Sequence, residues 1–273
     1  MSERERYPAG VPCWVETLQQ DPQAALDFYG PLFGWQVVGP GPMPGAEPAG
    51  YHVARVRGRD AAGIAPLPDP AGDLAPAWIT HVRVDSADEA AEQTKDAGGA
   101  LLDGPFDVLP AGRSAVLADP AGAVLCAWEA GTREGAQVVN EPNAWAMSML
   151  HTADPEGAIA FYGTTFGWRP EPLGAVTLWR LPGYVGGEPE QPVPRDVVGV
   201  MAPLGPGEAG PHWSVDFWVA DADATADRAA QLGGRVVVAP HDAPGFRAAV
   251  LVDPQGASFS ISQLVAEPGS ASA

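Results

Sequence analysis

Cysteine and lysine are scarce in this chain of 273 residues, and no apolar run is long enough to span a membrane. Cys13 and Cys126 are the only cysteines, too few for a disulfide framework or a structural zinc site. The first ten residues, MSERERYPAG, contain no apolar stretch of the kind found in signal peptides. We therefore expect a cytoplasmic protein with no membrane partner.

Basic residues are also few. Lys and Arg total 15 against 34 Asp and Glu, which gives a formal net charge of −19. Such a charge repels nucleic-acid phosphates and excludes that class of partner. The chain has no Walker loop or dinucleotide fingerprint, and its glycine-rich stretch GPGPMPGAEPAG is interrupted by prolines, which makes it a poor phosphate cradle. The charge favours neutral or cationic small molecules slightly, and an acidic, solubilising surface explains it equally well.

The chain does contain an internal repeat. DPQAALDFYGPLFGW, from Asp21, recurs as DPEGAIAFYGTTFGW, from Asp154, with nine of fifteen positions identical. RSAVLADPAGA, from Arg113, recurs as RAAVLVDPQGA, from Arg247, with eight of eleven identical. Similarity at such a long offset indicates duplicated domains rather than a short-period solenoid. We place the two domains at residues 8–132 and 142–265, with the join near residues 133–142.

Each half divides again into two similar units. Residues 13–20 read as a strand, and the following helix has Asp21 as N-cap, Pro22 at its first position and Gly34 at its end. Three short strands follow, and the pattern β-α-β-β-β occurs four times along the chain. The sequence therefore predicts an α+β fold. Residues 39–50 and 182–196 are rich in Pro and Gly and are expected to be loops, either lids or mobile insertions.

This order of elements resembles the vicinal oxygen chelate superfamily, which includes glyoxalase I, extradiol dioxygenases and bleomycin-resistance proteins. DFYGPLFGW and AFYGTTFGW are similar to its helix-to-strand signature, and DPAGA and DPQGA to its final hairpin. The resemblance covers residues 11–265. Within the superfamily, the chain is most similar to tandem-domain glyoxalase-like proteins of actinobacteria, some of which are encoded in antibiotic pathways. It implies four βαβββ modules paired into two curved sheets, each around a cavity. A monomer with an internal pseudo-dimer is expected, with a homodimer as the alternative.

The resemblance also implies where metal ligands would lie. Metal-dependent members carry His, Gln or Glu on the first and last strands of paired modules, which suits a divalent ion with open positions. Counting along this sequence puts these positions at Trp14, Ile79 and Cys126 in the first half and at Met147, Ser214 and Ser260 in the second. None of these residues is His, Gln or Glu. We therefore expect no metal site and no cofactor.

Alternation of side chains along each strand defines the residues that face the cavities. In the first half they are Trp14, Glu16, Ile79, His81, Arg83, Cys126 and Trp128, and in the second Met147, Met149, His151, Ser214, Asp216, Trp218, Ser260 and Ser262. This lining suits a largely apolar, aromatic ligand held by a few polar contacts. Trp14, Trp128 and Trp218 are candidates for stacking on it. Four other tryptophans are expected to fill the core: Trp35, Trp78, Trp168 and Trp213.

Two pairs could act in acid–base chemistry. Glu16 with His81, and His151 with Asp216, each combine a carboxylate and an imidazole, and a carboxylate can orient a histidine as a general base. The alternative is that these groups are structural pairs or are solvated. Three hypotheses follow: a metal-free protein that binds an aromatic metabolite or drug for sequestration or for biosynthetic tailoring; a cofactor-free isomerase, lyase or oxygenase-type enzyme; and a metal-dependent glyoxalase or dioxygenase, which the ligand positions disfavour.

Overall fold

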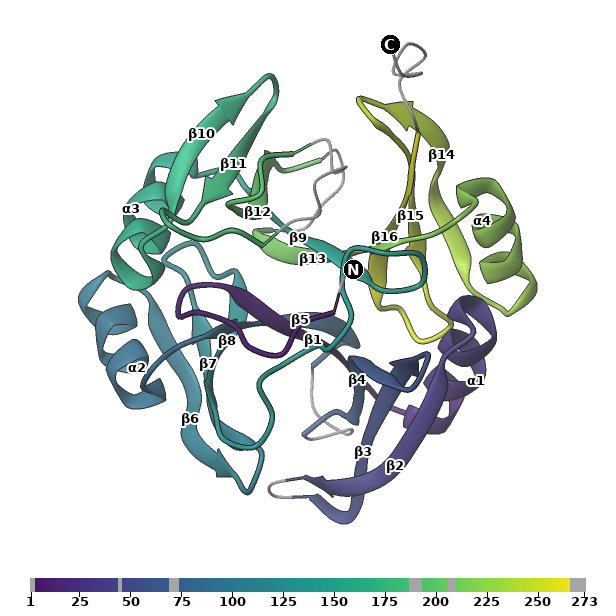
Figure 1. Cartoon of the computed structure of the whole chain (residues 1–273), viewed down its shortest axis with the longest axis horizontal. Coiled ribbons are helices and arrows are strands. Elements are labelled where there is room, and N and C mark those ends of the chain that lie inside the picture. Colours follow the sequence, from purple (N-terminus) through teal and green to yellow (C-terminus); the bar gives the residue numbers. More distant parts are fainter. Residues whose placement is uncertain (1–2, 44–45, 69–73, 187–192, 206–209, 266–273) are drawn as a thin grey trace.

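Two eight-stranded sheets, each with two helices, make up the computed structural model, which describes residues 3–43, 46–68, 74–186, 193–205 and 210–265 (Figure 1). The first half contains β1 (Pro12–Gln19), α1 (Pro22–Phe33), β2 (Gln36–Met43), β3 (Ala46–Val56), β4 (Arg59–Pro66), β5 (Ala77–Arg83), α2 (Ala87–Asp96), β6 (Ala100–Val108), β7 (Gly112–Ala118) and β8 (Val124–Ala130). The second contains β9 (Trp145–Thr152), α3 (Pro155–Phe166), β10 (Arg169–Leu173), β11 (Val176–Arg180), β12 (Val197–Pro203), β13 (His212–Trp218), α4 (Ala222–Gln231), β14 (Arg235–Ala243), β15 (Phe246–Val252) and β16 (Ser258–Leu264).

The element order confirms the four βαβββ modules and the α+β class. The strand order β2-β3-β4-β1-β5-β8-β7-β6 recurs in the second half as β10-β11-β12-β9-β13-β16-β15-β14. Antiparallel pairing of β1 with β5, and of β9 with β13, joins modules that are adjacent in the sequence. Each half therefore forms its own sheet, with the first strands of its two modules at the centre.

Helix α1 begins and ends where the sequence predicts. The Asp21 side chain accepts hydrogen bonds from the backbone N–H groups of Gln23 and Ala24, and Pro22 occupies the first turn. Gly34 takes the left-handed conformation, with φ of 66°, that ends the helix. The N-cap is repeated at α3, where Asp154 caps through the N–H of Gly157. The duplicated segments are thus equivalent helices.

The prediction of a loop over residues 39–50 is wrong for its described part. Residues up to Met43 continue β2, and residues from Ala46 begin β3, so this segment forms the end of a hairpin. Pro40 and Pro42 are compatible with β2 because it is an edge strand, where a missing N–H donor on the unpaired side breaks no ladder. The second expected loop is described except for residues 187–192, and its described part, up to the start of β12 at Val197, contains no strand or helix.

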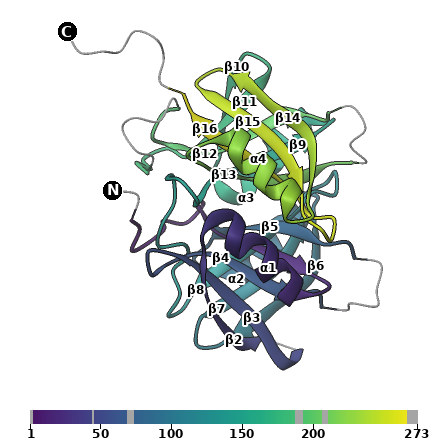
Figure 2. The same cartoon turned by 90° about the vertical axis from the view of Figure 1, so that its right-hand side faces the viewer.

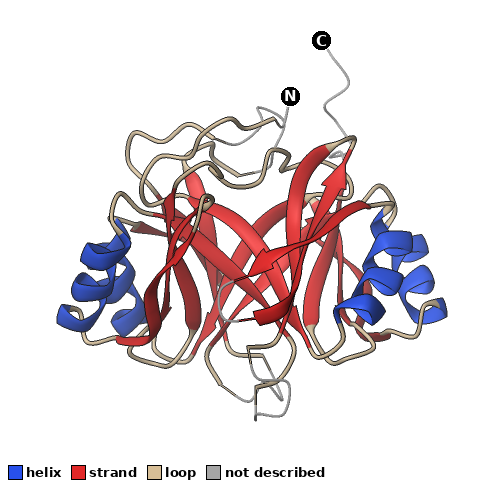
Figure 3. Ribbon diagram, turned by 90° about the horizontal axis from the view of Figure 1, so that it is seen from below, coloured by secondary structure: helices blue, strands red, loops and turns tan. Residues whose placement is uncertain are grey.

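The two halves contact each other reciprocally. Figure 2 shows one sheet above the other, and Figure 3 shows the helices at the two outer ends with the strands between them. Helix α1 lies beside α4 of the other half, and α2 beside α3. Phe217 and Phe259 of the second half pack against four aromatic rings of the first half, those of Tyr29, Phe33, Trp35 and Trp78. Trp35, Trp78, Trp168 and Trp213 are all buried, as predicted.

A buried hydrogen bond explains why both repeated motifs are needed together. The Tyr29 hydroxyl donates to Asp253 of the second half at 2.9 Å, and the Tyr162 hydroxyl donates to Asp119 of the first half at 3.0 Å. The other oxygen of each aspartate accepts backbone N–H groups of its own turn, such as that of Ala123. The tyrosine of one repeated segment thus binds the aspartate of the other across the two halves.

The glycine pairs that follow α2 and α4 have the same reciprocal role. A Cβ atom on Gly99 would lie 2.6 Å from the ring of Phe161, and one on Gly234 would lie 2.9 Å from the ring of Phe28. Only glycine leaves room for the aromatic ring of the opposite helix at such a close approach. The repeated FYG segment and the repeated Gly pair are therefore two sides of one interface.

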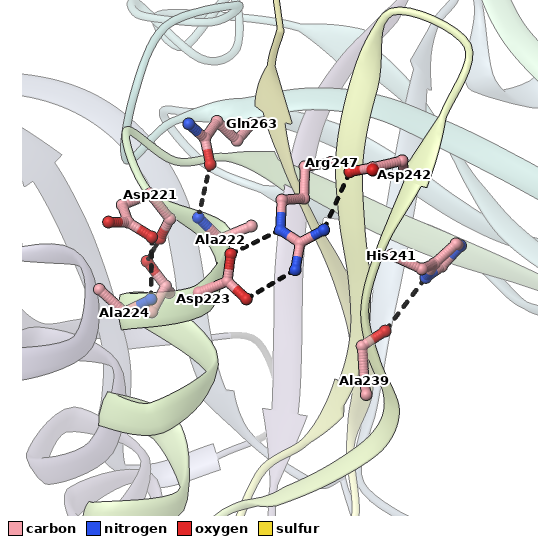
Figure 4. A network of polar contacts seen from close by, with 10 residues as sticks. Asp221, Ala222, Asp223, Ala224, Ala239, His241, Asp242, Arg247 and Gln263 are labelled. Carbon is pink, nitrogen blue, oxygen red and sulfur yellow. Dashed lines mark hydrogen bonds and ion pairs between the residues drawn. The ribbon is translucent and has the colours of Figure 1, made fainter.

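The repeated arginine ties each sheet to its own helix. Arg247, on β15, forms a pair of hydrogen bonds with Asp223 in the first turn of α4 and a further one with Asp242 on β14 (Figure 4). Arg113 makes the equivalent contacts with Asp88 and Asp107. None of the helices in the described part of the chain is long and apolar enough to cross a membrane.

Candidate functional site

The first half contains a cavity of about 820 Å³. Four residues predicted to face it do line it: Trp14 and Glu16 from β1, His81 from β5 and Trp128 from β8. Antiparallel pairing sets Trp14 opposite His81 and Glu16 opposite Ile79, so alternate positions of two strands meet on one face. Further lining residues come from outside the central strands, among them Tyr7, Tyr51 and Phe106.

A chain of polar contacts crosses the floor of this cavity. The Trp14 indole N–H donates to the Tyr51 hydroxyl at 2.9 Å, and this hydroxyl donates to Glu16 Oε2 at 2.7 Å. The other oxygen of Glu16 lies 3.3 Å from His81 Nε2. Burial raises the pKa of Glu16, but the nearby His81 and the hydrogen bond from Tyr51 outweigh burial and hold this pKa below its usual value. The carboxylate is therefore ionised near neutral pH.

His81 is enclosed by these contacts. Its side chain is almost completely buried, and its ring meets that of Trp128 edge to face with centroids 6.2 Å apart. Both ring nitrogens are covered from solvent, and neither has a well-aligned hydrogen bond within the described residues. The predicted pairing of Glu16 with His81 is thus present as a contact of 3.3 Å, with the imidazole enclosed at the cavity floor.

Both tryptophans of the cavity are walls rather than open platforms. Their side chains are 4% (Trp14) and 8% (Trp128) exposed. The guanidinium of Arg133 lies over the Trp14 ring, 5.3 Å from its centroid, which is within the range of a cation–π contact. The Trp128 indole N–H donates to the Arg133 carbonyl at 2.9 Å. A ligand would therefore meet Arg133 before it met the face of Trp14.

The segment that joins the two halves forms part of the cavity wall. Residues 132–137 line the cavity, and Ala136 is bound on two sides: its N–H donates to Cys13 of β1 at 2.7 Å, and its carbonyl accepts from Tyr7 at 2.6 Å. Gln137 exchanges hydrogen bonds with the backbone of Asp60. Sequence reasoning treated this segment only as the domain join, because its position over the sheet is a tertiary contact with no local signal.

Two arginines share one buried carboxylate at the cavity. Arg55 Nε donates to Asp60 Oδ1 at 2.7 Å, and Arg133 Nη1 lies 3.3 Å from Asp60 Oδ2. The Asp60 side chain is only 11% exposed. Sequence reasoning missed all three residues. The only available signal was indirect: Arg55 and Asp60 flank a tight turn in a chain with few basic residues.

Three further predicted residues of this half do not line the cavity. Ile79 is half-buried opposite Glu16. Arg83 donates instead to the backbone carbonyl of Val84 and lies 3.5 Å from Asp85. Cys126 is buried beneath the site, and burial raises the pKa of its thiol, so that it remains protonated.

The register of the central strands shows which residues stand beside the expected ligand positions. Trp14 and Cys126 both stand opposite His81, not Ile79. In the second half, Met147 and Ser260 both stand opposite Asp216, not Ser214. Each row therefore holds one imidazole or one carboxylate. No group of three His, Cys, Asp or Glu residues able to hold a metal ion occurs in the part of the chain that the structure describes.

In the second half, His151 and Asp216 are not brought together. His151 stands opposite His212, with the two rings stacked at 4.7 Å, and its Nε2 lies 3.0 Å from the Ser214 hydroxyl. Asp216 stands opposite Met147, four residues along β9, or roughly 13 Å away at the strand rise. Asp216 instead accepts a hydrogen bond from Ser262, and burial raises its pKa to about 7.

The same face of the second sheet carries the other predicted residues. Met147 and Met149 are half-buried and pack against the small cluster of Leu178, Val197 and Val200. The ring of Trp218 is half-buried and meets that of Phe246 with centroids 6.3 Å apart. Ser260 stands opposite Asp216. The two halves therefore share a scaffold but not a set of polar groups, since Glu16 and His81 correspond to Met149 and Asp216.

Comparisons with known proteins agree with this fold. Residues 14–127 match the family described as the Glyoxalase/Bleomycin resistance protein/Dioxygenase superfamily, and residues 146–262 match the family described as Glyoxalase-like domain. The chain belongs to this glyoxalase/bleomycin resistance/dioxygenase superfamily, with two such domains in tandem.

Relatives match over almost the whole length. The protein is 37% identical over 263 residues to CFP32 of Mycobacterium tuberculosis, covering 96% of this chain and 97% of the relative. It is 35% identical over 271 residues to the anthracycline biosynthesis protein DnrV of Streptomyces peucetius, covering 95% of each. The structure of the Mn(II)-bound glyoxalase from Novosphingobium aromaticivorans superposes with a TM-score of 0.62 at 16% identity, over 93% of this chain and 82% of that one, which supports the fold alone.

Proposed function

We propose that this protein binds a planar aromatic metabolite in the cavity of its first half, without a metal ion, to sequester it or to assist its biosynthetic tailoring. The observation that carries this proposal is the cavity itself. Its volume of about 820 Å³ falls in the range typical of small-molecule sites, and aromatic side chains supply much of its wall. A few polar groups, including Glu16, Tyr51 and Arg133, are placed to fix the orientation of a ligand.

The relatives support an aromatic polyketide as the ligand class. The anthracycline biosynthesis proteins DnrV and DauV are 35% and 34% identical to this chain over 95% of its length. Relatives of this similarity share a fold, and the cavity is the part of the fold that could accept a polycyclic compound. The proposal extends the role of these relatives to this chain.

Binding is favoured over catalysis by the burial of His81. A general base must reach the proton it removes, directly or through one water molecule. Both ring nitrogens of His81 are covered. Catalysis by this residue would therefore require a rearrangement of the cavity floor, whereas binding requires none.

A cofactor-free enzyme remains the second candidate because Glu16 and His81 do lie together, 3.3 Å apart. Under this alternative, His81→Ala would abolish turnover of the bound compound while its affinity changes little. The assay is mass spectrometry of the ligand after prolonged incubation with the protein. Unchanged ligand with the parent protein argues for binding alone.

The binding proposal can be tested by titrating the protein with a panel of anthraquinones while following tryptophan fluorescence. We expect saturable quenching, because Trp14 and Trp128 border the cavity. Val108→Trp should block the cavity and abolish the response, since Val108 lines it. Val237→Trp is the matched control, because Val237 is exposed on β14 of the other half. Equal binding by both variants, or none by the parent, would refute the proposal.

Metal independence is the second part of the proposal. The rows Trp14–His81–Cys126 and Met147–Asp216–Ser260 each offer too few ionisable ligands for a divalent ion. We expect protein purified without chelator to carry no stoichiometric Zn, Fe, Mn or Ni, and added ions not to raise its thermal stability. Elemental analysis and thermal unfolding provide the test. A stoichiometric ion bound at either row would contradict this part of the proposal.

A further inference from the structure

Arg133 is held with unused hydrogen-bond donors inside the cavity. Its guanidinium carbon lies over the Trp14 ring, 5.3 Å from the centroid, and its Nη1 forms an ion pair with Asp60 at 3.3 Å. Beyond this ion pair, no hydrogen bond from its guanidinium to another described residue is present. Arginine carries five N–H donors in a planar fork, so most of its donors lack a protein acceptor here.

The charges around Arg133 leave it partly unneutralised. Asp60 is shared with Arg55, so one carboxylate faces two guanidinium groups. Glu16 is engaged by His81 and Tyr51. The charged residues of the lining are four arginines and four acids, Arg4, Arg55, Arg59, Arg133, Glu5, Glu16, Asp60 and Glu134, which sum to zero. The formal net charge of −19 therefore comes entirely from residues that do not line the cavity.

We infer that the ligand is an aromatic carboxylate and that Arg133 binds its carboxylate group. This inference rests on the proposed function and specifies its ligand class. A planar guanidinium matches a carboxylate with two parallel hydrogen bonds, which neither a lysine nor a neutral donor provides. The aromatic part of the ligand would extend from Arg133 toward Phe106 and Tyr51, while Trp14 below the guanidinium and Asp60 at its side keep the fork in place.

The test compares an anthraquinone carboxylate with the matching anthraquinone carboxamide, which has the same ring system and no charge. We expect the full-length parent protein to bind the carboxylate at least about tenfold more tightly, as for a charge-assisted hydrogen bond of about 1.5–3 kcal/mol. The preference should weaken as salt is added, because screening reduces the attraction between partly exposed charges. Isothermal titration calorimetry measures both affinities.

Three variants assign the preference to a residue. Arg133→Leu should lose the preference, because carboxylate binding falls much more than carboxamide binding, and the carboxamide binding that remains shows that the cavity is intact. Arg133→Lys should keep part of it, since charge remains but the planar fork is lost. Arg113→Leu is the matched control and should behave as the parent, because Arg113 pairs with Asp88 and Asp107 and does not line the cavity.

The outcomes separate the inference from the proposed function. If the parent binds both compounds equally, or if Arg133→Leu retains the preference, the inference is overturned and the proposed function stands. If the parent binds neither compound, the proposed function fails and the inference with it. Loss of carboxamide binding in Arg133→Leu would also overturn the inference, because Arg133 would then support the cavity rather than recognise the acid.

Discussion

Gly63 decides whether the floor of the cavity can form. Gly63 lies in β4, opposite Glu16 of β1. A Cβ atom on Gly63 would collide with the Tyr51 hydroxyl and lie 2.8 Å from Glu16 Cβ. We predict that Gly63→Ala displaces Tyr51 from Glu16 and destabilises the fold by about 1–3 kcal/mol, as overpacking does. Urea unfolding measures the effect.

Gly30→Ala provides the control for this substitution. Gly30 lies in α1, and a Cβ atom there meets its nearest neighbour, the Trp35 carbonyl oxygen, at an ordinary 3.9 Å. This variant should be neutral or more stable by up to about 1 kcal/mol, because alanine is the better helix former. Equal losses in the two variants would show that the crowding at Tyr51 is not the cause.

Asp216 should make stability depend on pH. Burial raises its pKa in the folded protein to about 7, above the ordinary value near 4 in the unfolded chain. The folded state then holds more protons than the unfolded state between about pH 4 and 7, so stability falls as pH rises through that range. Asp216→Asn removes this term, and its melting temperature should exceed that of the parent more at pH 8 than at pH 5. A constant difference across pH would refute the assignment.

Alternation along the central strands predicted which face borders the cavity, but not which positions on that face line it. Trp14, Glu16, His81 and Trp128 line the cavity as the pattern indicates. Ile79, Arg83 and Cys126 share the same alternation but lie outside the lining, because periodicity gives the face of a strand and not how far a cavity extends along it. Tyr51 and Arg133 were missed because they reach the cavity from strands or segments distant in the sequence.

At the scale of elements, the aromatic residue that follows α1 holds the two halves together. Trp35 is 6% exposed, lies 5.6 Å from Phe217 of the second half, and donates its indole N–H to the Asn143 carbonyl at 2.7 Å. We predict that Trp35→Ala lowers the free energy of unfolding by about 3–5 kcal/mol. Trp218→Ala, at a half-buried position, is the matched comparison and should have a clearly smaller effect. A similar loss in both would contradict the interface role of Trp35.

Element boundaries were predictable where capping chemistry marks them. Asp21, Pro22 and Gly34 delimit α1 in the sequence and in the structure, because each satisfies a local backbone requirement. The hairpin of β2 and β3 was mistaken for a loop, since Pro and Gly usually interrupt strands. An edge position removes that penalty, and whether a strand lies at an edge is a property of the whole sheet rather than of its own residues.

At the scale of the molecule, the reciprocal interface makes each half dependent on the other. Residues 1–140 alone would expose Tyr29, Phe33 and Trp35, which the complete chain buries. Because Phe28 packs on Gly234 as Phe161 packs on Gly99, a second copy of the first half offers an equivalent surface. We predict that this fragment forms a homodimer, measured by analytical ultracentrifugation. A stable folded monomer of the fragment would contradict the prediction.

The duplication was evident in the sequence, but its purpose was not. The repeated residues Tyr29 and Tyr162, with Asp119 and Asp253, could be matched along the chain without revealing that each tyrosine binds the aspartate of the other half. That pairing depends on which module packs against which. Sequence periodicity carries no such information, because either arrangement would repeat the same residues.

Fusion of the two halves into one chain has an evolutionary consequence. In a homodimer, one gene specifies both concave faces, and any substitution that suits a ligand on one face is imposed on the other. Here the residues that join the halves are repeated, whereas Glu16 and His81 on one face correspond to Met149 and Asp216 on the other. A single gene can therefore change one face by mutation while the other stays as it is. The ligand proposed for the face that carries Glu16 therefore places no requirement on the chemistry of the face that carries Asp216.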